Sequence, residues 1–443
     1  MQFIEIKDYI LLPIYLAIIY VIAYNRRNSR YNPHSPLYKY YIPALTAKIV
    51  GALSLGIVYQ YYYRGGDTGI YFINSKLVSE FFFTDFGSFI DLIFKPVTST
   101  VELRNSIRWL GDNYAFSESN FFAIRILAPL QLLTFGSYLA SASIFAYLSF
   151  IGVWKVYTSF VHIYPNLYKK FAIAFLFMPS VFFWGSGILK DSVCIAALGW
   201  LFYGCYMLFI LRIRIAQSVV IVLLSISVLM IVKVYIALAF LPSLLFWIFF
   251  TYRSRIRSTF LKVTALPAIC VIVLLSAYFV VMSLSKDTDR FAVNQIVNQA
   301  ATFNTNNMVN AGSAIDIGVT QDMSVQSLIK IAPLAIITTL FRPFIWEGRS
   351  ALMLLSALEA TYVLLIFLSL LKTNILSTFS IILQNPLVTF CLIFSICFAF
   401  AVGFSTSNFG TLVRYKIPCV PFFMVALFIL QDKTARPLFK VGS

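Results

Sequence analysis

Residues 215–251 decide the fold class: they read IAQSVVIVLLSISVLMIV, then Lys233, then VYIALAFLPSLLFWIFFT. Both apolar runs lack charged residues, and each approaches the ~20 residues with which a helix crosses the hydrocarbon core of a bilayer. A lysine between two such runs predicts a turn at a membrane surface, because a charged side chain is costly in hydrocarbon. The stretch therefore predicts two antiparallel membrane-spanning helices.

The same pattern recurs along the 443 residues, of which 60% are hydrophobic and only 12% are charged, with a mean hydropathy of +0.85. Soluble domains do not have this composition. We expect an all-α, polytopic integral membrane protein that forms one transmembrane domain over residues 1–443, with about eleven transmembrane helices. The predicted spans are 9–24, 42–62, 137–160, 171–185, 192–211, 215–232, 234–251, 263–284, 350–371, 386–404 and 417–431.

Short loops rich in lysine and arginine predict the orientation, because such loops stay on the cytoplasmic side. The strongest signal is the loop that holds Arg26, Arg27, Arg30 and Lys39. Basic residues at alternate turns agree with it, so the N-terminus is predicted outside and the C-terminus inside. These further residues are Lys169, Lys170, Arg212, Arg214, Arg253, Arg255, Arg257, Lys262, Lys372, Lys433, Arg436 and Lys440.

Two apolar stretches, 121–135 and 331–341, are short for a span and contain proline or adjoin charges, so we expect re-entrant or interfacial helices there. Two long outer loops follow from this topology. The loop 64–120 contains the phenylalanine-rich segments 81–83 and 86–94, which suit helices that lie in the interface. The loop 286–326 is polar, as expected of a lid over a site or, equally, of a solvated connector.

The composition also excludes functions. The net charge of +17 comes from basic residues scattered between apolar runs, so no nucleic-acid-binding domain is predicted. The plausible anionic partners are membrane lipid headgroups or a phosphorylated lipid substrate. The six cysteines lack the short paired spacing of a zinc site, and no divalent metal or other cofactor is indicated.

Several basic residues fall at predicted outer boundaries, where topology alone does not require them. A phosphate or pyrophosphate at the outer headgroup level explains them, because arginine binds it with two hydrogen bonds and lysine as a point charge. The alternative for any single residue is that it reaches toward outer-leaflet lipid phosphates. These residues are Arg64, Lys190, Lys233, Arg342, Arg349, Arg414 and Lys416.

Two polar motifs among them offer further candidates. Asp67 follows two glycines directly after the second span and is a candidate general base toward a sugar hydroxyl; the alternative is a Gly-Gly-Asp-Thr turn or helix cap. Lys190 and Asp191 follow a Trp-Gly-Ser-Gly turn (184–187), whose amides are expected to face the external phase and to favour anions. Lys190 is the stronger functional candidate, and the alternative is an ion pair with helix capping.

A third cluster precedes the predicted span 350–371. Arg342, Trp346, Glu347 and Arg349 combine cations, an aromatic face and a carboxylate, and Glu359 lies inside the span. An ionisable group within a membrane segment is rarely idle, so Glu359 either orients the basic residues or relays a proton, or else is a protonated or paired packing residue. Sugar stacking or an aromatic belt at the interface would explain a set of aromatic residues: Tyr59, Tyr61, Tyr62, Tyr63 and Trp346.

Asp67, the outer basic residues and the late element Arg-Tyr-Lys-Ile-Pro-Cys-Val-Pro (414–421) resemble the GT-C superfamily of polytopic glycosyltransferases and the related O-antigen and exopolysaccharide polymerases. The resemblance implies a polyprenyl-phosphate- or pyrophosphate-linked sugar donor and a glycan acceptor at the outer face of the bacterial cytoplasmic membrane. It implies that Asp67 is the base and that Arg342, Arg414 and Lys416 hold the lipid phosphate and stabilise charge on the leaving group. From their positions in the sequence, Glu347 joins Asp67 and Arg342 as a catalytic candidate, and Arg64, Lys190 and Arg349 are further phosphate-binding candidates. The candidate supporting residues are Asp191, Trp346, Glu359 and Tyr415.

This sequence departs from that family at the acidic motif, where Gly-Gly-Asp-Thr replaces the usual pair of acidic residues. Because of this departure, a polymerase, which relies more on arginines, competes with a transferase as the predicted activity. Two other classes stay open, a transporter of lipid-linked oligosaccharides and a non-catalytic subunit of an envelope assembly. Other envelope-biosynthesis proteins are candidate partners for any of these.

Overall fold

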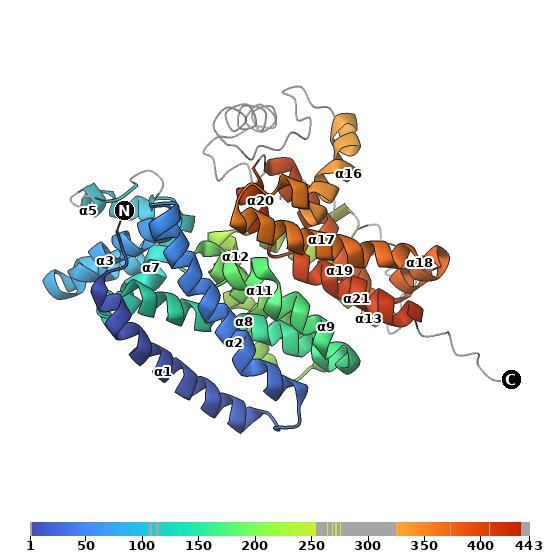
Figure 1. Cartoon of the computed structure of the whole chain (residues 1–443), viewed down its shortest axis with the longest axis horizontal. Coiled ribbons are helices and arrows are strands. Elements are labelled where there is room, and N and C mark those ends of the chain that lie inside the picture. The colour runs from blue at the N-terminus through green and yellow to red at the C-terminus, as the bar shows by residue number, and fades with distance from the viewer. Residues whose placement is uncertain are drawn as a thin grey trace.

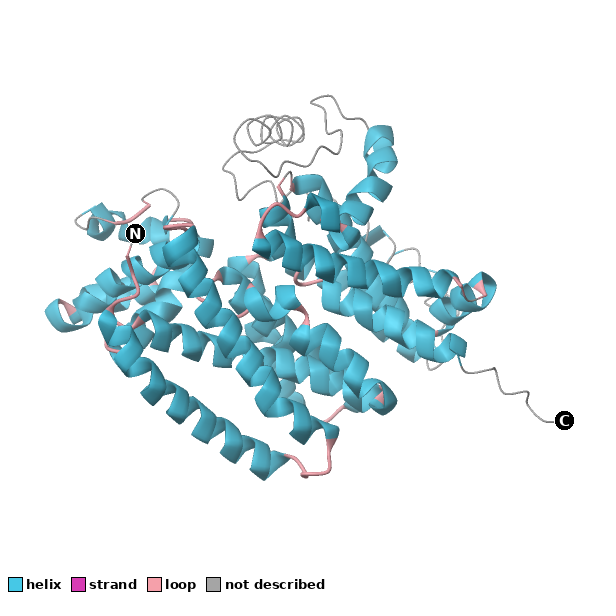
Figure 2. Ribbon diagram, viewed as in Figure 1, coloured by secondary structure: helices cyan, strands magenta, loops and turns pink. Residues whose placement is uncertain are grey.

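A computed structural model describes residues 2–105, 109–111, 115–253, 325–372, 374–406 and 408–435, with isolated positions between 264 and 275. Every regular element in these residues is a helix, as Figure 2 shows. The elements are α1 (Ile6–Arg30), α2 (Pro36–Ile57), η1 (Val58–Tyr62), α3 (Asp67–Thr84), α4 (Phe86–Phe94), η2 (Val97–Thr100), α5 (Val101–Asn105), α7 (Glu118–Leu133), α8 (Tyr138–Ile163), η3 (Pro165–Leu167), α9 (Tyr168–Ala172), η4 (Ile173–Phe177), α10 (Pro179–Phe183), α11 (Lys190–Cys205), η5 (Tyr206–Leu211), α12 (Ile215–Val232), α13 (Val234–Tyr252), α16 (Val325–Phe341), η8 (Ile345–Glu347), α17 (Ala351–Leu371), α18 (Ile375–Gln384), α19 (Pro386–Ser405), α20 (Phe409–Tyr415) and α21 (Val420–Ala435).

Long apolar helices make this a multi-pass membrane protein. Within the described ranges, eight helices are long and apolar enough to cross a bilayer, or nine if α20 and α21, bent by 65°, form one broken span. Some of them expose apolar side chains that water would not tolerate in such numbers: on α12, Val220, Leu223 and Leu224 are 54–63% exposed. Lipid chains are the medium that covers such a face.

The predicted number of eleven spans is not confirmed. The predicted span 171–185 was wrong as a continuous helix, because the chain becomes extended at Met178 between η4 and α10. Pro179 explains the break, since proline disfavours the helical conformation of the residue before it. The predicted span 263–284 lies outside the described residues apart from a few isolated positions. The predicted span 417–431 corresponds to α21, the second half of the bent pair.

The predicted outer loop 64–120 is largely helical. The 18-residue helix α3 packs against α7, which covers the predicted short helix 121–135, and the aromatic segment 86–94 forms α4. Arg125 on α7 ties these elements together, because it pairs with Glu118 at 2.9 Å and donates to the Leu92 carbonyl at 3.0 Å. The predicted lid 286–326 lies outside the described residues except for its last two positions.

The centre of the bundle is held by close helix packing. Small residues let α8 and α11 touch: a Cβ on Gly199 would lie 2.1 Å from the Gly152 carbonyl oxygen, so both positions need glycine. Further along α11, Phe202 stacks on Phe160 at 4.5 Å between ring centroids and on Trp247 of α13 at 5.5 Å. α11 therefore lies between α8 and α13, as Figure 1 also shows for α8 and α11.

The two ends of the bundle differ in character. At the end that we call the basic end, Lys170 donates to Gln431, and Gln431 donates to Ser369 near the C-terminal end of α17. Lys155, about two turns before the end of α8, lies in the same half of the bundle, over the rings of Trp200 and Tyr203. α17 begins at Ala351, roughly 30 Å away at 1.5 Å per residue. The polar clusters predicted for the outer face lie near that opposite end.

Candidate functional site

A cleft of about 530 Å³ opens where η1, the start of α3, α17 and α20 come together, at the end opposite the basic end. Its wall combines two arginines, one carboxylate, aromatic rings and small polar groups. The lining residues are Tyr59, Tyr63, Gly65, Gly66, Asp67, Trp184, Arg349, Ser350, Leu352, Met353, Ser356, Asn408, Phe409, Gly410, Thr411, Val413 and Arg414. A site of this size and mixed polarity suits a small polar ligand or one sugar unit with its phosphate.

The backbone between α2 and α3 delivers three of these residues. The π-helical turn η1 ends α2, and Tyr59 on it is buried while Tyr63 follows it. The chain then turns through Arg64, with φ of 54°, and Gly66, with φ of 117° and the N-cap position of α3. Asp67 is the first residue of α3, where the helix dipole stabilises its negative charge. The expected helix start at Gly-Gly-Asp-Thr is confirmed, and the carboxylate of Asp67 lines the cleft. Its role as a general base stays a prediction.

Gly66→Ala is expected to destabilise the protein by about 1–3 kcal/mol, because the added Cβ would meet the Tyr59 ring at 2.7 Å in a backbone conformation that favours glycine. Thermal unfolding of the purified protein in detergent would measure this. Gly87→Ala is the control, since Gly87 has no positive φ and meets only the Asp85 carboxylate, at 3.3 Å. Equal stability of the two variants would contradict the strain argument.

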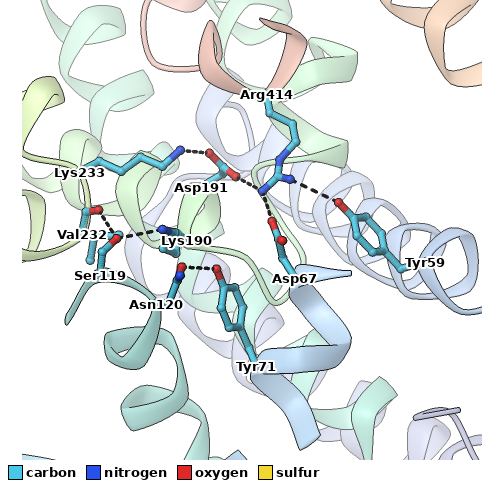
Figure 3. A network of polar contacts seen from close by, with 10 residues as sticks. All are labelled: Tyr59, Asp67, Tyr71, Ser119, Asn120, Lys190, Asp191, Val232, Lys233 and Arg414. Carbon is cyan, nitrogen blue, oxygen red and sulfur yellow. Dashed lines mark hydrogen bonds and ion pairs between the residues drawn. The ribbon is translucent and has the colours of Figure 1, made fainter. Parts of the chain in front are cut away.

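Arg414 is the centre of the polar network drawn in Figure 3. Its Nη2 donates to Asp67 Oδ2 at 2.9 Å and to Asp191 Oδ2 at 3.0 Å, and its Nη1 lies 3.4 Å from the Tyr59 hydroxyl. The guanidinium also lies 5.6 Å from the centre of the Trp184 ring. Side chains from α3, α11, α20 and the end of α2 thus meet at one arginine.

The neighbouring residues Lys190 and Asp191 take different partners. Asp191 is 5% exposed and binds both Arg414 and Lys233, whose Nζ lies 2.5 Å from Asp191 Oδ1. Lys190 donates to Ser119 on α7 at 2.9 Å. The expectation that Trp184–Gly187 faces the external phase was wrong, because the turn is buried and Ser186 is fully covered.

A second polar cluster lies beside the cleft and does not line it. Arg342 forms two hydrogen bonds with Glu347, one from Nε at 3.1 Å, and Lys416 donates to the Arg342 carbonyl at 3.0 Å. Partial burial opposes ionisation of Glu347, but the hydrogen bonds from Arg342 and from the Phe344 amide outweigh it, so its pKa is lowered. Glu347 is therefore an ionised partner of Arg342, and its predicted catalytic role is not tested by its position.

Glu359 lies one turn below the floor of the cleft, because Ser356 on the same helix lines it. The side chain is 4% exposed, and Oε2 accepts a hydrogen bond from the Ser180 amide at 2.6 Å. Its Oε1 has no hydrogen-bond partner among the described residues. Glu359 thus joins α17 to the start of α10 and supports the cleft from beneath.

The other predicted residues divide between the cleft and its surroundings. Arg349 is exposed and lines the cleft; Arg64 is exposed in the turn before it but is not among the lining residues. Trp346 is 81% exposed and stacks on Phe344, and Tyr415 lies beneath the Lys233 ammonium at 4.6 Å. Among the predicted aromatic residues, only Tyr59 and Tyr63 line the cleft.

Sequence reasoning assigned no role in the cleft to Trp184, Asn408 or Thr411, all of which line it. Trp184 entered the sequence analysis only as part of a turn. Asn408 and Thr411 lie a few residues before Arg414, and this proximity was the signal in the sequence that could have identified them. Within the described ranges, no three His, Cys, Asp or Glu side chains group as metal ligands.

No protein-family model, curated protein or solved structure matches this chain. The class that fold and site define is a multi-pass α-helical membrane protein with a charged and aromatic cleft at one end of its bundle.

Proposed function

We propose that this protein transfers or polymerises sugars linked to a polyprenyl phosphate or pyrophosphate, at the outer face of the bacterial cytoplasmic membrane. The observation that carries the proposal is the lining of the cleft, where Asp67, Arg349 and Arg414 meet Tyr59, Tyr63 and Trp184. A carboxylate, two arginines and aromatic rings supply a base, a phosphate site and stacking surfaces for one sugar–phosphate unit.

In this reaction, a hydroxyl oxygen of the acceptor glycan attacks the anomeric carbon of the donor sugar. The new glycosidic C–O bond forms as the bond from that carbon to the lipid phosphate oxygen breaks. Asp67 accepts the hydroxyl proton, and the electron pair of the broken bond stays on the phosphate. Arg414 and Arg349 stabilise the charge that develops there, because arginine donors in a water-poor site are already oriented toward it.

The proposed orientation follows from the same geometry. Arg26, Arg30, Lys170 and Arg214 lie toward the end opposite the cleft, and turns rich in lysine and arginine remain in the cytoplasm. The cleft then faces the outer side, with the N-terminus outside and the C-terminus inside. A transporter would need charges at the midplane and on both faces, whereas this network gathers at one end.

Arg349→Ala, at wild-type protein levels, is expected to lower glycan output by about tenfold or more and to cause lipid-linked precursors to accumulate, because a phosphate contact in the cleft is lost. Mass spectrometry of extracted lipids and surface glycan would measure both. Lys95→Ala is the control, since Lys95 is 55% exposed at the end of α4 and forms an ion pair with Asp91.

Shortened polymer with intact repeat units would identify a polymerase, and loss of one sugar would identify a transferase. Precursor that accumulates on the inner leaflet only would instead identify a transporter. An unchanged profile in Arg349→Ala would contradict the proposal and favour a non-catalytic assembly subunit.

A further inference from the structure

Lys233 has no part in the transfer chemistry above, yet it occupies the deepest position of the network. It is the single charged residue between α12 and α13, and its side chain is only 6% exposed. Its Nζ lies 2.5 Å from Asp191 Oδ1 and 4.6 Å from the centre of the Tyr415 ring. A lysine buried this deeply keeps its charge most readily when a charged partner compensates it.

The network is a chain of alternating charge in the order Lys233, Asp191, Arg414, Asp67 (Figure 3). The side chains of Lys233 and Asp191 are 6% and 5% exposed, whereas those of Arg414 and Asp67 are 20% and 24% exposed and both line the cleft. The inner pair is therefore fixed by its surroundings. The outer pair, between Arg414 and Asp67, is the link that a ligand in the cleft can reach.

The net charge around Arg414 depends on Lys233. If Lys233 were absent, Asp191 alone would neutralise Arg414, and an anion would meet no net positive charge at Arg414. With Lys233 present, Lys233, Asp191 and Arg414 together carry one net positive charge, which Asp67 balances when the cleft is empty. A buried charge that cancels another one in this way changes the field at the cleft without touching the ligand.

We infer that Lys233 is a positioning residue that keeps Arg414 available to a phosphate group, and that this phosphate replaces Asp67 as the partner of Arg414. The exchange frees the Asp67 carboxylate to accept the acceptor hydroxyl proton only after the donor phosphate has arrived. This last step rests on the proposed function, whereas the anion exchange at Arg414 does not.

The hydrogen bonds of Arg414 allow the exchange. Both carboxylates share Nη2, while Nη1 makes a long contact of 3.4 Å with Tyr59, which also lines the cleft. Arginine offers five N–H donors and binds phosphate through two of them at once. A phosphate oxygen at Nη1 and a second one at the Asp67 position on Nη2 would satisfy this geometry.

The test is binding of farnesyl phosphate, a short isoprenoid phosphate, to the purified full-length protein in lipid nanodiscs. Lys233→Met is expected to weaken binding by about tenfold or more, since it leaves Asp191 to neutralise Arg414. The double variant Lys233→Met/Asp191→Asn removes one charge of each sign and is expected to recover most of the affinity. Asp67→Asn is expected to bind farnesyl phosphate more tightly than the wild type, because it removes the competitor for Arg414.

Lys155→Met is the matched control, since Lys155 also lies over aromatic rings but in the half of the bundle at the basic end. Thermal unfolding of each variant is measured first, so that a loss of binding is not mistaken for a loss of folding. Binding of farnesol, which lacks the phosphate, measures the contribution of the isoprenoid chain alone. Wild-type affinity in Lys233→Met, no recovery in the double variant, or weaker binding in Asp67→Asn would overturn the inference. If the purified variants follow this binding pattern but the same variants leave the glycan of cells unchanged, the inference holds and the proposed function is refuted.

Discussion

Arg414→Gln is expected to lower sugar transfer by about 10²–10³-fold or more, because it removes oriented donors to the leaving phosphate. Arg414 is the shared partner of Asp67 and Asp191, so its loss also leaves two carboxylates to share the single positive charge of Lys233. Breaking such a buried pair costs about 3–5 kcal/mol, and protein levels must therefore be matched. Precursor accumulation in cells and transfer by the purified protein measure the effect.

Arg414→Lys separates charge from geometry. It keeps one positive charge but loses the planar fork that can bind a phosphate through two nitrogens, so we expect it to fold better than Arg414→Gln and to transfer poorly. Arg30→Gln, exposed at the basic end, is the control for loss of an arginine. More than a tenth of wild-type transfer in folded Arg414→Gln would refute the role of this residue.

Asp67→Asn is expected to slow transfer by about 10²–10⁴-fold while donor binding persists, because the amide cannot accept the hydroxyl proton. The side chain keeps its size and its place at the start of α3, so the expected loss is in kcat rather than in KM. Single-turnover rates with a synthetic lipid-linked sugar would measure it.

Asp91→Asn is the control for Asp67→Asn, since Asp91 is 42% exposed and its ion pair with Lys95 on α4 contributes little to stability. Asp67→Glu is expected to retain part of the activity, because it restores a carboxylate at a slightly different distance. A wild-type rate in Asp67→Asn would remove Asp67 from the chemistry and would leave a polymerase that depends on its arginines.

Hydropathy predicted much of the fold, because in lipid each spanning helix must satisfy its own backbone and so appears as an uninterrupted apolar run. The predicted runs 215–232 and 234–251 correspond to α12 and to all but the last residue of α13. Hydropathy failed at 171–185, where the apolar run conceals the break before Pro179, and at 67–84, where mixed polar and apolar residues form α3. The aromatic pattern at 86–94 did predict the helix α4.

The candidate site was predicted in outline and missed in detail. The outer-boundary rule selected Asp67, Arg349 and Arg414, which line one cleft. Lys190 was predicted to be a stronger functional candidate than Asp191, whereas Asp191 is the residue that binds Arg414 and Lys190 binds Ser119. Adjacent helical residues point about 100° apart, and only the packing of α11 decides which one turns toward Arg414. The outer-boundary rule also grouped Arg342, Glu347 and Lys416 with the cleft, although they form a neighbouring cluster.

The sequence by itself determined that this chain is a helical membrane protein with basic turns and with unusual charges at the other ends of its helices. The tertiary structure alone decided which of these charges meet. Asp67 and Arg414 are 347 positions apart, and Lys233 reaches them through Asp191 on a different helix. Hydropathy is a property of each segment and can be read locally, whereas an ion pair depends on how helices pack, and that packing is set by many contacts such as Gly152 against Gly199.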